Sequence, residues 1–309
     1  MSRMLLFPGQ GAQAVGMGKD LCGASPAAKA VFARASDLLG FDLLALCAEG
    51  PAEELTQSEN TQPAIFTHSA ALLAAAEEQG LDLASVAGAA GLSSGEWAAL
   101  YAAGVVTFEA AIRILRARGR FMQEACDATA GGMISVIGLD AAACEKIAAD
   151  AGLVAANYNS PQQTVLSGPA ENIARAEELA AAAGAKMAVR LTVAGAFHGP
   201  LMRPAADRLA EVLAAETFAS PRFPVWSNVT ARPHGEAASI PAMMLQQVYS
   251  SVRWSESFAD MAAHGMTEAI ELGPGKVLSG LARRIDRNVR AVSASDLPTL
   301  LAAFAAGSN

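Results

Sequence analysis

The sequence predicts an α/β fold, because short apolar runs of strand length alternate with alanine-rich stretches of helical length. Strand candidates lie at residues 4–7, 86–90, 224–228 and 268–272. The second of these runs into a glycine-bounded serine turn and then into a helical stretch, which is the strand-turn-helix arrangement of an α/β-hydrolase. We therefore expect a large α/β-hydrolase-like domain with a parallel-sheet core.

A second, smaller unit is predicted within residues 127–196, where the order of the predicted strands and helices changes. Its strands and helices alternate in the order β-α-β-β-α-β, which is the ferredoxin-like split unit. Glycines at 131–132 and at 195 mark its ends. We expect this subdomain to be inserted into the large domain, which then comprises residues 1–126 and 197–309. The expected elements are strands at 133–137, 153–157, 164–167 and 187–191 and helices at 141–151 and 170–183.

The composition is that of a compact enzyme: of 309 residues, 52% are hydrophobic and 17% are charged. No apolar run approaches the ~18 residues of a membrane span, and the run near the N-terminus is too short for a signal peptide, so we expect a cytoplasmic protein without membrane association. The 4 cysteines lie far apart without metal-ligand spacing, which predicts free thiols and no metal site. The net charge of −8 argues against nucleic acid as a partner, because phosphate binding usually needs a basic face.

Residues 91–95 read Gly-Leu-Ser-Ser-Gly, the G-x-S-x-G pattern of a nucleophile elbow. Glycines are needed at both ends, because bulkier residues would clash where the chain reverses. The turn places Ser93 at a helix N-terminus, where free backbone N–H groups can hold a developing oxyanion. The pattern alone leaves two interpretations open: Ser93 is a covalent nucleophile, or it caps an ordinary glycine-rich loop.

A serine nucleophile needs a general base, and histidine is the usual one because its ordinary pKa lies near neutrality. His234 falls in a predicted exposed turn and His264 at a predicted helix end, so both are interpreted as structural. His68 lies within a predicted buried helix and is interpreted as a core residue. His198 lies in a glycine-flanked loop where the chain returns to the large domain, which makes it the candidate base.

A predicted helix at 111–125 carries Arg118 in the middle of an apolar face. A guanidinium in that position needs an anion or hydrogen-bond acceptors to offset its lost hydration. Two interpretations are open: a salt bridge to a buried carboxylate of this chain, or a clamp for the carboxylate of a substrate. The other residues of the apolar face are Ile114, Leu115, Phe121 and Met122.

Two polar segments are candidates for the lining of the same cleft. Gln10 follows the first strand candidate, and loops after the carboxyl ends of parallel strands meet at one crevice. Its alternative role is to stabilise the loop. Asn157 and Asn159, in Asn-Tyr-Asn-Ser-Pro, are either turn residues or cleft lining.

Six segments, in this order, resemble the malonyl-CoA:acyl carrier protein transacylase family, which also occurs as acyltransferase domains in fatty acid and polyketide synthases. The resemblance extends over essentially the whole chain. Each motif is modest alone, but the six together are specific. They lie at residues 7–13, 91–96, 118–124, 157–161, 195–198 and 271–278.

The resemblance implies transfer of a malonyl group from malonyl-CoA to the phosphopantetheine thiol of acyl carrier protein, through a malonyl-serine intermediate in a ping-pong route, in fatty acid or polyketide biosynthesis. It implies Ser93 as nucleophile, His198 as base and Arg118 as partner of the malonyl carboxylate. It also implies an oxyanion hole made of the backbone N–H groups of Ser94 and Gln10. No permanently bound cofactor is expected, because the coenzyme A thioester is a substrate, and the protein is expected to be a monomer.

The family also suggests finer features. The base is oriented by a backbone carbonyl, here expected from around Arg253. Some members have glutamine before tryptophan where this chain has Arg253-Trp254, so Arg253 either adds a second cation near the carboxylate or faces solvent. Phe197 resembles members that prefer malonyl over methylmalonyl groups, because the ring crowds the α-carbon. Leu92 departs from the family, which commonly has histidine before the nucleophile.

Two rival functions are compatible with these residues. A serine esterase or thioesterase with the same elbow would pass the acyl group to water, and a non-catalytic scaffold would only bind the carrier protein. A local basic run is either a solvated helix face or a surface that steers an acidic carrier protein. The run comprises Arg283, Arg284, Arg287 and Arg290.

Overall fold

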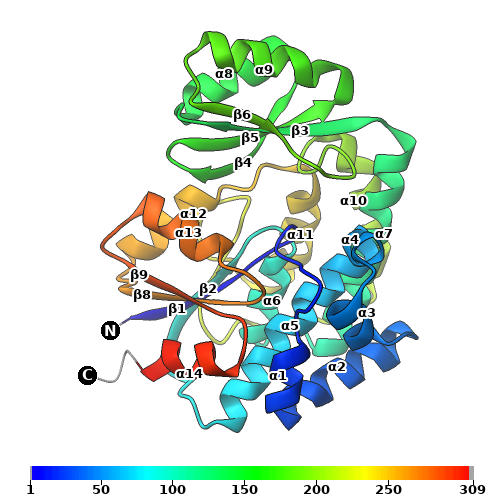
Figure 1. The fold of residues 1–309 in the computed structure, drawn as a ribbon, viewed down its shortest axis with the longest axis vertical. Helices are drawn as coiled ribbons and strands as arrows, with labels where there is room; N and C mark the ends of the chain where they lie inside the picture. Colours follow the sequence, from blue (N-terminus) through cyan, green and yellow to red (C-terminus); the bar gives the residue numbers. More distant parts are fainter. Residues whose placement is uncertain (1, 306–309) are drawn as a thin grey trace.

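The computed structural model describes residues 2–305 and contains two separate sheets (Figure 1). The larger sheet is parallel, with the strand order β7-β2-β1-β8-β9. Residues 1 and 306–309 of the predicted large domain lie outside the described part of the chain. The strands of this sheet are β1 (Arg3–Phe7), β2 (Val86–Gly91), β7 (Val225–Trp226), β8 (Glu268–Leu272) and β9 (Arg290–Ala294).

The predictions of strands at 4–7, 86–90 and 268–272 are confirmed to within one residue at each end. The prediction at 224–228 is confirmed only for Val225–Trp226, because the chain turns from Asn228 onward. The sequence pattern does not predict β9, because this edge strand mixes exposed and buried side chains without a long apolar run.

Helices cover both faces of the parallel sheet (Figure 1). Those of the large domain are α1 (Lys19–Ala24), α2 (Pro26–Leu39), α3 (Leu43–Glu49), α4 (Ala52–Thr56), α5 (Ser58–Glu78), α6 (Gly95–Ala102), α7 (Phe108–Ala128), α10 (Arg203–Ala214), α11 (Ile240–Tyr249), α12 (Trp254–Ala263), α13 (Val277–Ile285) and α14 (Leu297–Ala305). Short 3-10 turns occur at η1 (Ala170–Asn172), η2 (Pro200–Met202) and η3 (Ala237–Ser239).

Strand β1 lies in the centre of the sheet and is buried on both faces, which explains its unbroken apolar sequence. Because side chains alternate across a strand, Leu5 and Phe7 pack with α2, α5, α6 and α7. Met4 and Leu6 point to the other face and pack with α12 and α13. Within residues 2–305, no helix combines the length and the apolar character needed to cross a membrane.

The second sheet is antiparallel, with the order β4-β5-β3-β6. Two helices, α8 (Ala141–Ala151) and α9 (Ile173–Ala182), pack on it through their own small core. The predicted β-α-β-β-α-β order and the α/β fold class are confirmed. Helix α7 continues two residues beyond the predicted boundary at 126, and the boundaries of the subdomain stay a prediction. The strands are β3 (Gly131–Ile137), β4 (Val154–Ser160), β5 (Gln163–Pro169) and β6 (Met187–Arg190).

The topology brings the loops after β1 and β2 together, since the two strands are parallel neighbours. The contact is close at Gly9, where an added Cβ would lie 2.2 Å from the carbonyl oxygen of Leu92. Only glycine therefore allows the loop after β1 to lie directly against the serine turn.

Candidate active site

The turn after β2 has the geometry of a nucleophile elbow. An added Cβ on Gly91 would lie 2.0 Å from the carbonyl carbon of Gly95, and one on Gly95 would lie 2.2 Å from the carbonyl oxygen of Phe7. Ser93, at the tip, has a φ of 53°, a left-handed conformation that costs energy in a residue with a Cβ. The strand, the glycines and the strained serine together present the Ser93 hydroxyl at the start of α6.

Backbone strain is concentrated around this turn. Within residues 2–305, three residues other than glycine have positive φ: Ser93 at 53°, His198 at 57° and Ala231 at 56°. Such conformations persist only where the surrounding structure holds them. The candidate nucleophile and the candidate base are both among the three.

The side chains of Ser93 and His198 are in contact. Ser93 Oγ lies 2.7 Å from His198 Nε2, and His198 Nδ1 lies 3.0 Å from the carbonyl oxygen of Gln247 on α11. A carbonyl can only accept, so Nδ1 carries the hydrogen and Nε2 is free to take the serine proton. The orienting carbonyl therefore comes from Gln247, and the expectation that it comes from around Arg253 is wrong.

Burial sets the protonation state of the base. His198 is 4% exposed, and burial, with a smaller contribution from the nearby Arg118 cation, lowers its pKa to about 4. The imidazole is consequently neutral at neutral pH, which is the form that accepts a proton from serine.

Arg118 lies fully buried on α7, as its position in the apolar face predicts. Its Nη1 donates to Gln62 Oε1 at 2.8 Å, and its Nη2 donates to Gln247 Oε1 at 2.9 Å and to Ser93 Oγ at 3.3 Å. All three acceptors are neutral, so the interpretation as a salt bridge within the chain is not supported. Burial lowers the pKa of Arg118 to about 10, which leaves the guanidinium charged at neutral pH.

These groups open into a cleft of about 470 Å³, formed by the loops after β1 and β2, by α7 and by the antiparallel sheet. Phe197 is buried beside His198 in its wall. Asn157 and Asn159 also line it, but they lie in β4 and not in a turn, because β4 extends to Ser160. Other residues that line the cleft include Gly9, Gln10, Leu92, Ser93, Arg118, Met133, Val165 and His198.

Gln10 combines both of its expected roles. Its side-chain Nε2 donates to Ser58 Oγ at 3.0 Å, and its Oε1 accepts from Gln62 Nε2 at 3.4 Å, so the side chain stabilises the loop. The backbone N–H groups of Gln10 and Ser94 donate no hydrogen bond to any residue within 2–305. Two free N–H groups beside the serine are what an oxyanion hole requires.

Arg253 does not line the cleft. Its guanidinium donates to Glu256 Oε1 at 2.9 Å and to the carbonyl oxygen of Thr230 at 3.5 Å, at the start of α12. The expectation of a second substrate-binding cation is therefore wrong, because a neighbouring carboxylate already holds this side chain at the surface.

The basic run is not one helix face, because a turn interrupts it. Arg283 and Arg284 end α13, Arg287 lies in the following turn and Arg290 begins β9. The interpretation of these four arginines as a single helical surface is wrong.

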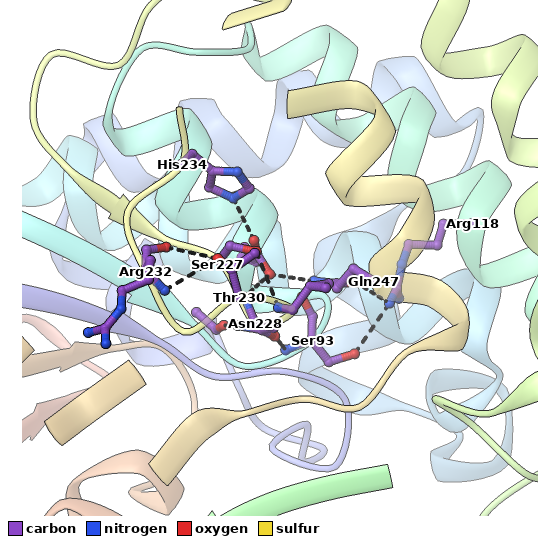
Figure 2. Close-up of polar contacts among 11 residues, drawn as sticks. Ser93, Arg118, Ser227, Asn228, Thr230, Arg232, His234 and Gln247 are labelled. Atoms are coloured by element: carbon purple, nitrogen blue, oxygen red, sulfur yellow. Dashed lines mark hydrogen bonds and ion pairs between the residues drawn. The ribbon is translucent and has the colours of Figure 1, made fainter. Parts of the chain in front are cut away.

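Polar residues that the sequence analysis missed or placed wrongly surround the elbow (Figure 2). Asn228 Oδ1 accepts from the backbone N–H of Ser93 at 2.7 Å, and Asn228 Nδ2 donates to the Gly91 carbonyl oxygen at 2.7 Å. The prediction that His234 lies in an exposed turn is wrong: its side chain is 2% exposed and its Nε2 lies 2.6 Å from Glu96 Oε1. Glu96 could have been found by the criterion used for Arg118, because it is a charged residue in an otherwise apolar helix.

The remaining histidines are structural. His68 is buried in α5, and burial lowers its pKa to about 4, which confirms its interpretation as a core residue. His264 Nδ1 lies 2.8 Å from the carbonyl oxygen of Asp260 at the end of α12, as expected for a histidine at a helix terminus. The four cysteines are free and buried.

A second hollow, of about 850 Å³, lies at the opposite end of β2. Its lining includes Leu5, Val86, Tyr101 and Arg222, and no serine, cysteine or histidine of residues 2–305 contributes to it. No group of three or more histidine, cysteine, aspartate or glutamate residues in the described chain is arranged to hold a metal ion. Among residues 2–305, the candidate nucleophile, the candidate base and the buried cation line the smaller cleft and not this hollow.

Comparison with known proteins agrees with this geometry. Residues 4–299 match the model of the acyl transferase domain. The chain is 44% identical over 300 residues to the malonyl CoA-acyl carrier protein transacylase of Bacillus subtilis, covering 96% of this chain and 94% of that protein. It is also 44% identical over 303 residues to the protein of that name from Salmonella typhimurium, covering 97% of each.

Solved structures show the same fold. An acyl carrier protein S-malonyltransferase from Vibrio cholerae superposes with a TM-score of 0.94 at 42% identity, over 98% of this chain and 99% of that one. A malonyl-transacylase solved in complex with its type II PKS acyl-carrier protein superposes with a TM-score of 0.96 at 39% identity, over 99% and 100% of the two chains. The chain belongs to the acyl transferase domain family, as its motifs predict.

Proposed function

We propose that the protein transfers a malonyl group from malonyl-CoA to the phosphopantetheine thiol of an acyl carrier protein, through a malonyl ester on Ser93. One observation carries the proposal. Ser93 Oγ contacts both a neutral histidine, 2.7 Å away, and a buried arginine, 3.3 Å away, that bonds to no carboxylate of residues 2–305. The first contact supplies a nucleophile, and the second selects an acidic acyl group.

In the first half-reaction, His198 Nε2 takes the proton of the Ser93 hydroxyl as Oγ attacks the thioester carbonyl carbon. The negative charge that develops on the carbonyl oxygen is stabilised by the backbone N–H groups of Gln10 and Ser94. The intermediate then collapses with cleavage of the carbon–sulfur bond. Coenzyme A leaves as its thiol, with the proton that His198 returns.

In the second half-reaction, the phosphopantetheine thiol gives its proton to His198 and its sulfur attacks the ester carbonyl. The carbon–oxygen bond to Ser93 breaks, and His198 returns the proton to Oγ. The enzyme is then restored, and the product is the malonyl thioester of the carrier protein. This order of events is a ping-pong route, because coenzyme A departs before the carrier protein reacts.

Arg118 explains the choice of acyl group. Its guanidinium lies 3.3 Å from the oxygen that carries the acyl chain, so a short dicarboxylic chain can reach it. A carboxylate would neutralise the buried charge through charge-assisted hydrogen bonds. A neutral acyl group would leave that charge without an anion, which costs several kcal/mol at a buried site.

Intact-mass spectrometry tests the proposal directly. After incubation with malonyl-CoA and no carrier protein, the wild-type chain should gain one malonyl group, and Ser93→Ala should gain none. Later addition of carrier protein should move the group to the carrier. A gain that disappears in water before the carrier is added would favour an esterase, and no Ser93-dependent gain would leave a binding scaffold.

The proposal extends to the setting of the reaction. We place the enzyme in the cytoplasm, where its four free cysteines stay reduced, and in fatty acid or polyketide biosynthesis. It acts as a monomer without a bound cofactor, because one chain supplies the nucleophile, the base, the oxyanion donors and the cation. Gel filtration of the active protein and acyl transfer after dialysis against a chelator test these two points.

A further inference from the structure

A buried carboxylate lies directly behind the elbow. Glu96, in the first turn of α6, is fully buried. Its Oε2 accepts from Gln247 Nε2 at 2.7 Å and from the backbone N–H of Asn228 at 3.1 Å. Its Oε1 lies 2.6 Å from His234 Nε2. A buried carboxylate is stable only when its oxygens are satisfied in this way. Two of the residues that satisfy it, Gln247 and Asn228, also hydrogen-bond to the backbone of Ser93.

Gln247 connects this carboxylate to Ser93 and Arg118 (Figure 2). It also contacts His198 through its backbone carbonyl. Its Nε2 also donates to the Ser93 carbonyl oxygen at 2.8 Å, and its Oε1 accepts from Arg118 at 2.9 Å. Its backbone carbonyl accepts from His198 Nδ1 at 3.0 Å. An amide flip at Gln247 would turn its NH₂ towards Arg118 and its oxygen towards Glu96, placing like groups together. The two charges therefore hold the amide in one orientation.

Asn228 connects the same carboxylate to the strained turn. Its backbone N–H is held by Glu96, while its side chain accepts from the Ser93 N–H and donates to the Gly91 carbonyl oxygen, each at 2.7 Å. Both hydrogen bonds close the elbow around the left-handed Ser93. Strain of this kind needs such support from the surrounding structure.

His234 completes the set by facing the second carboxylate oxygen. With its side chain 2% exposed, it lies in the segment between β7 and α11 that also contains Asn228 and the left-handed Ala231. The His234 ring therefore ties this segment to the elbow helix α6. Neither Glu96 nor His234 hydrogen-bonds to Ser93 Oγ or to the His198 ring, so both residues act through their neighbours.

We propose that Glu96 and His234 form a positioning pair, which holds Gln247 and Asn228 so that Ser93, His198 and Arg118 keep their reactive arrangement. The proposal rests on the acyl transfer proposed above. Neither residue transfers a proton. Together they keep His198, the strained Ser93 and Arg118 in their reactive orientation.

The decisive variant is Glu96→Ala, compared with Glu96→Gln. The alanine leaves three N–H donors without an acceptor, so kcat for malonyl transfer should fall about 100-fold, while KM for malonyl-CoA changes much less. The ratio of malonyl to acetyl transfer should fall about tenfold, because Arg118 loses the fixed partner at Gln247. Glutamine should restore most of kcat, since its oxygen can accept from Asn228 and Gln247 and its NH₂ can pair with the His234 ring.

A matched control separates positioning from stability. Glu268 is also a buried carboxylate of the large domain, but it bonds Arg3 and Arg290 at the far edge of the parallel sheet. Glu268→Ala should lose stability and keep both kcat per folded molecule and the malonyl-to-acetyl ratio. His234→Ala gives a second measurement if Glu96→Ala does not fold, with an expected fall in kcat of about tenfold that His234→Gln reverses.

Wild-type kcat and an unchanged malonyl-to-acetyl ratio in folded Glu96→Ala or His234→Ala would overturn the proposal. Equal losses in Glu96→Ala and Glu268→Ala would also overturn it. The function itself is tested separately by the Ser93-dependent mass gain of the wild-type chain. If that gain occurs at the wild-type rate in Glu96→Ala, the positioning pair fails while the transferase stands.

Discussion

Buried charges are arranged differently at the two ends of the strands of the parallel sheet. At the edge where the strands begin, Glu268 of β8 contacts Arg3 of β1 at 2.6 Å and also bonds Arg290 of β9. At the edge where they end, the amide of Gln247 separates Arg118 from Glu96, although both are buried. Direct pairing ties neighbouring strands together. Separation by a neutral amide keeps the cation apart from Glu96, as the proposed binding of a malonyl carboxylate by Arg118 requires.

Of the changes at the two ends of the strands, removal of the Arg118 cation should have the largest effect on activity. In Arg118→Ala, kcat/KM for malonyl transfer should fall about 1,000-fold and that for acetyl transfer about tenfold or less, because only the malonyl group uses the charge. Both thioesters are measured with the same carrier protein. Arg120→Ala, in the same helix but with its side chain 54% exposed, is the control and should change neither rate. Equal losses for the two acyl groups in Arg118→Ala would refute the clamp.

The pH dependence of acylation should show how burial and the Arg118 cation together lower the pKa of His198. A histidine with a lowered pKa is in its basic form above that pKa, so the acylation rate should hold down to about pH 4 and fall about tenfold per pH unit below it. Arg118→Met should move this acidic limb to higher pH, because the cation contributes to the lowered pKa of His198. Single-turnover acylation between pH 3.5 and 9 measures both, with folding checked by circular dichroism. An acidic limb near pH 6.5 in the wild type would contradict the burial argument.

A change at Glu268, where the strands begin, should lower the stability of the fold and leave kcat unchanged. Glu268→Ala leaves Arg3, whose side chain is 12% exposed, without its carboxylate partner, and should lower the free energy of unfolding by about 2 kcal/mol. Urea denaturation measures the loss, and transfer assays at low temperature measure kcat per folded molecule. A fall in kcat comparable to that of Glu96→Ala would mean that the two edges are not functionally distinct.

Local patterns account for what could be predicted. Ser93 lies in a five-residue motif, and Arg118 stands out from the 3.6-residue periodicity of its own helix, so a short window is enough to find each of them. The apolar strands β1, β2 and β8 are found in the same way, to within one residue. The edge strand β9 is not found, because its exposed residues break the apolar run.

The positions that prediction missed depend on contacts across the chain. Gln247 and His234 reach the elbow from positions more than 100 residues away in the sequence. Nothing in the residues next to Arg253 distinguishes a cleft residue from a surface pair with Glu256, which the fold decides.

The sequence by itself determined the α/β class, the strand-turn-helix around Ser93 and the buried position of Arg118, because each follows from backbone geometry and periodicity over a few residues. Only the tertiary structure decided which carbonyl orients His198, which amide separates Arg118 from Glu96, and that His234 is buried. The physical reason is that a buried polar group takes whichever partner the packing of distant segments brings within about 3 Å. Short-range patterns show that such a partner is needed but not which residue supplies it.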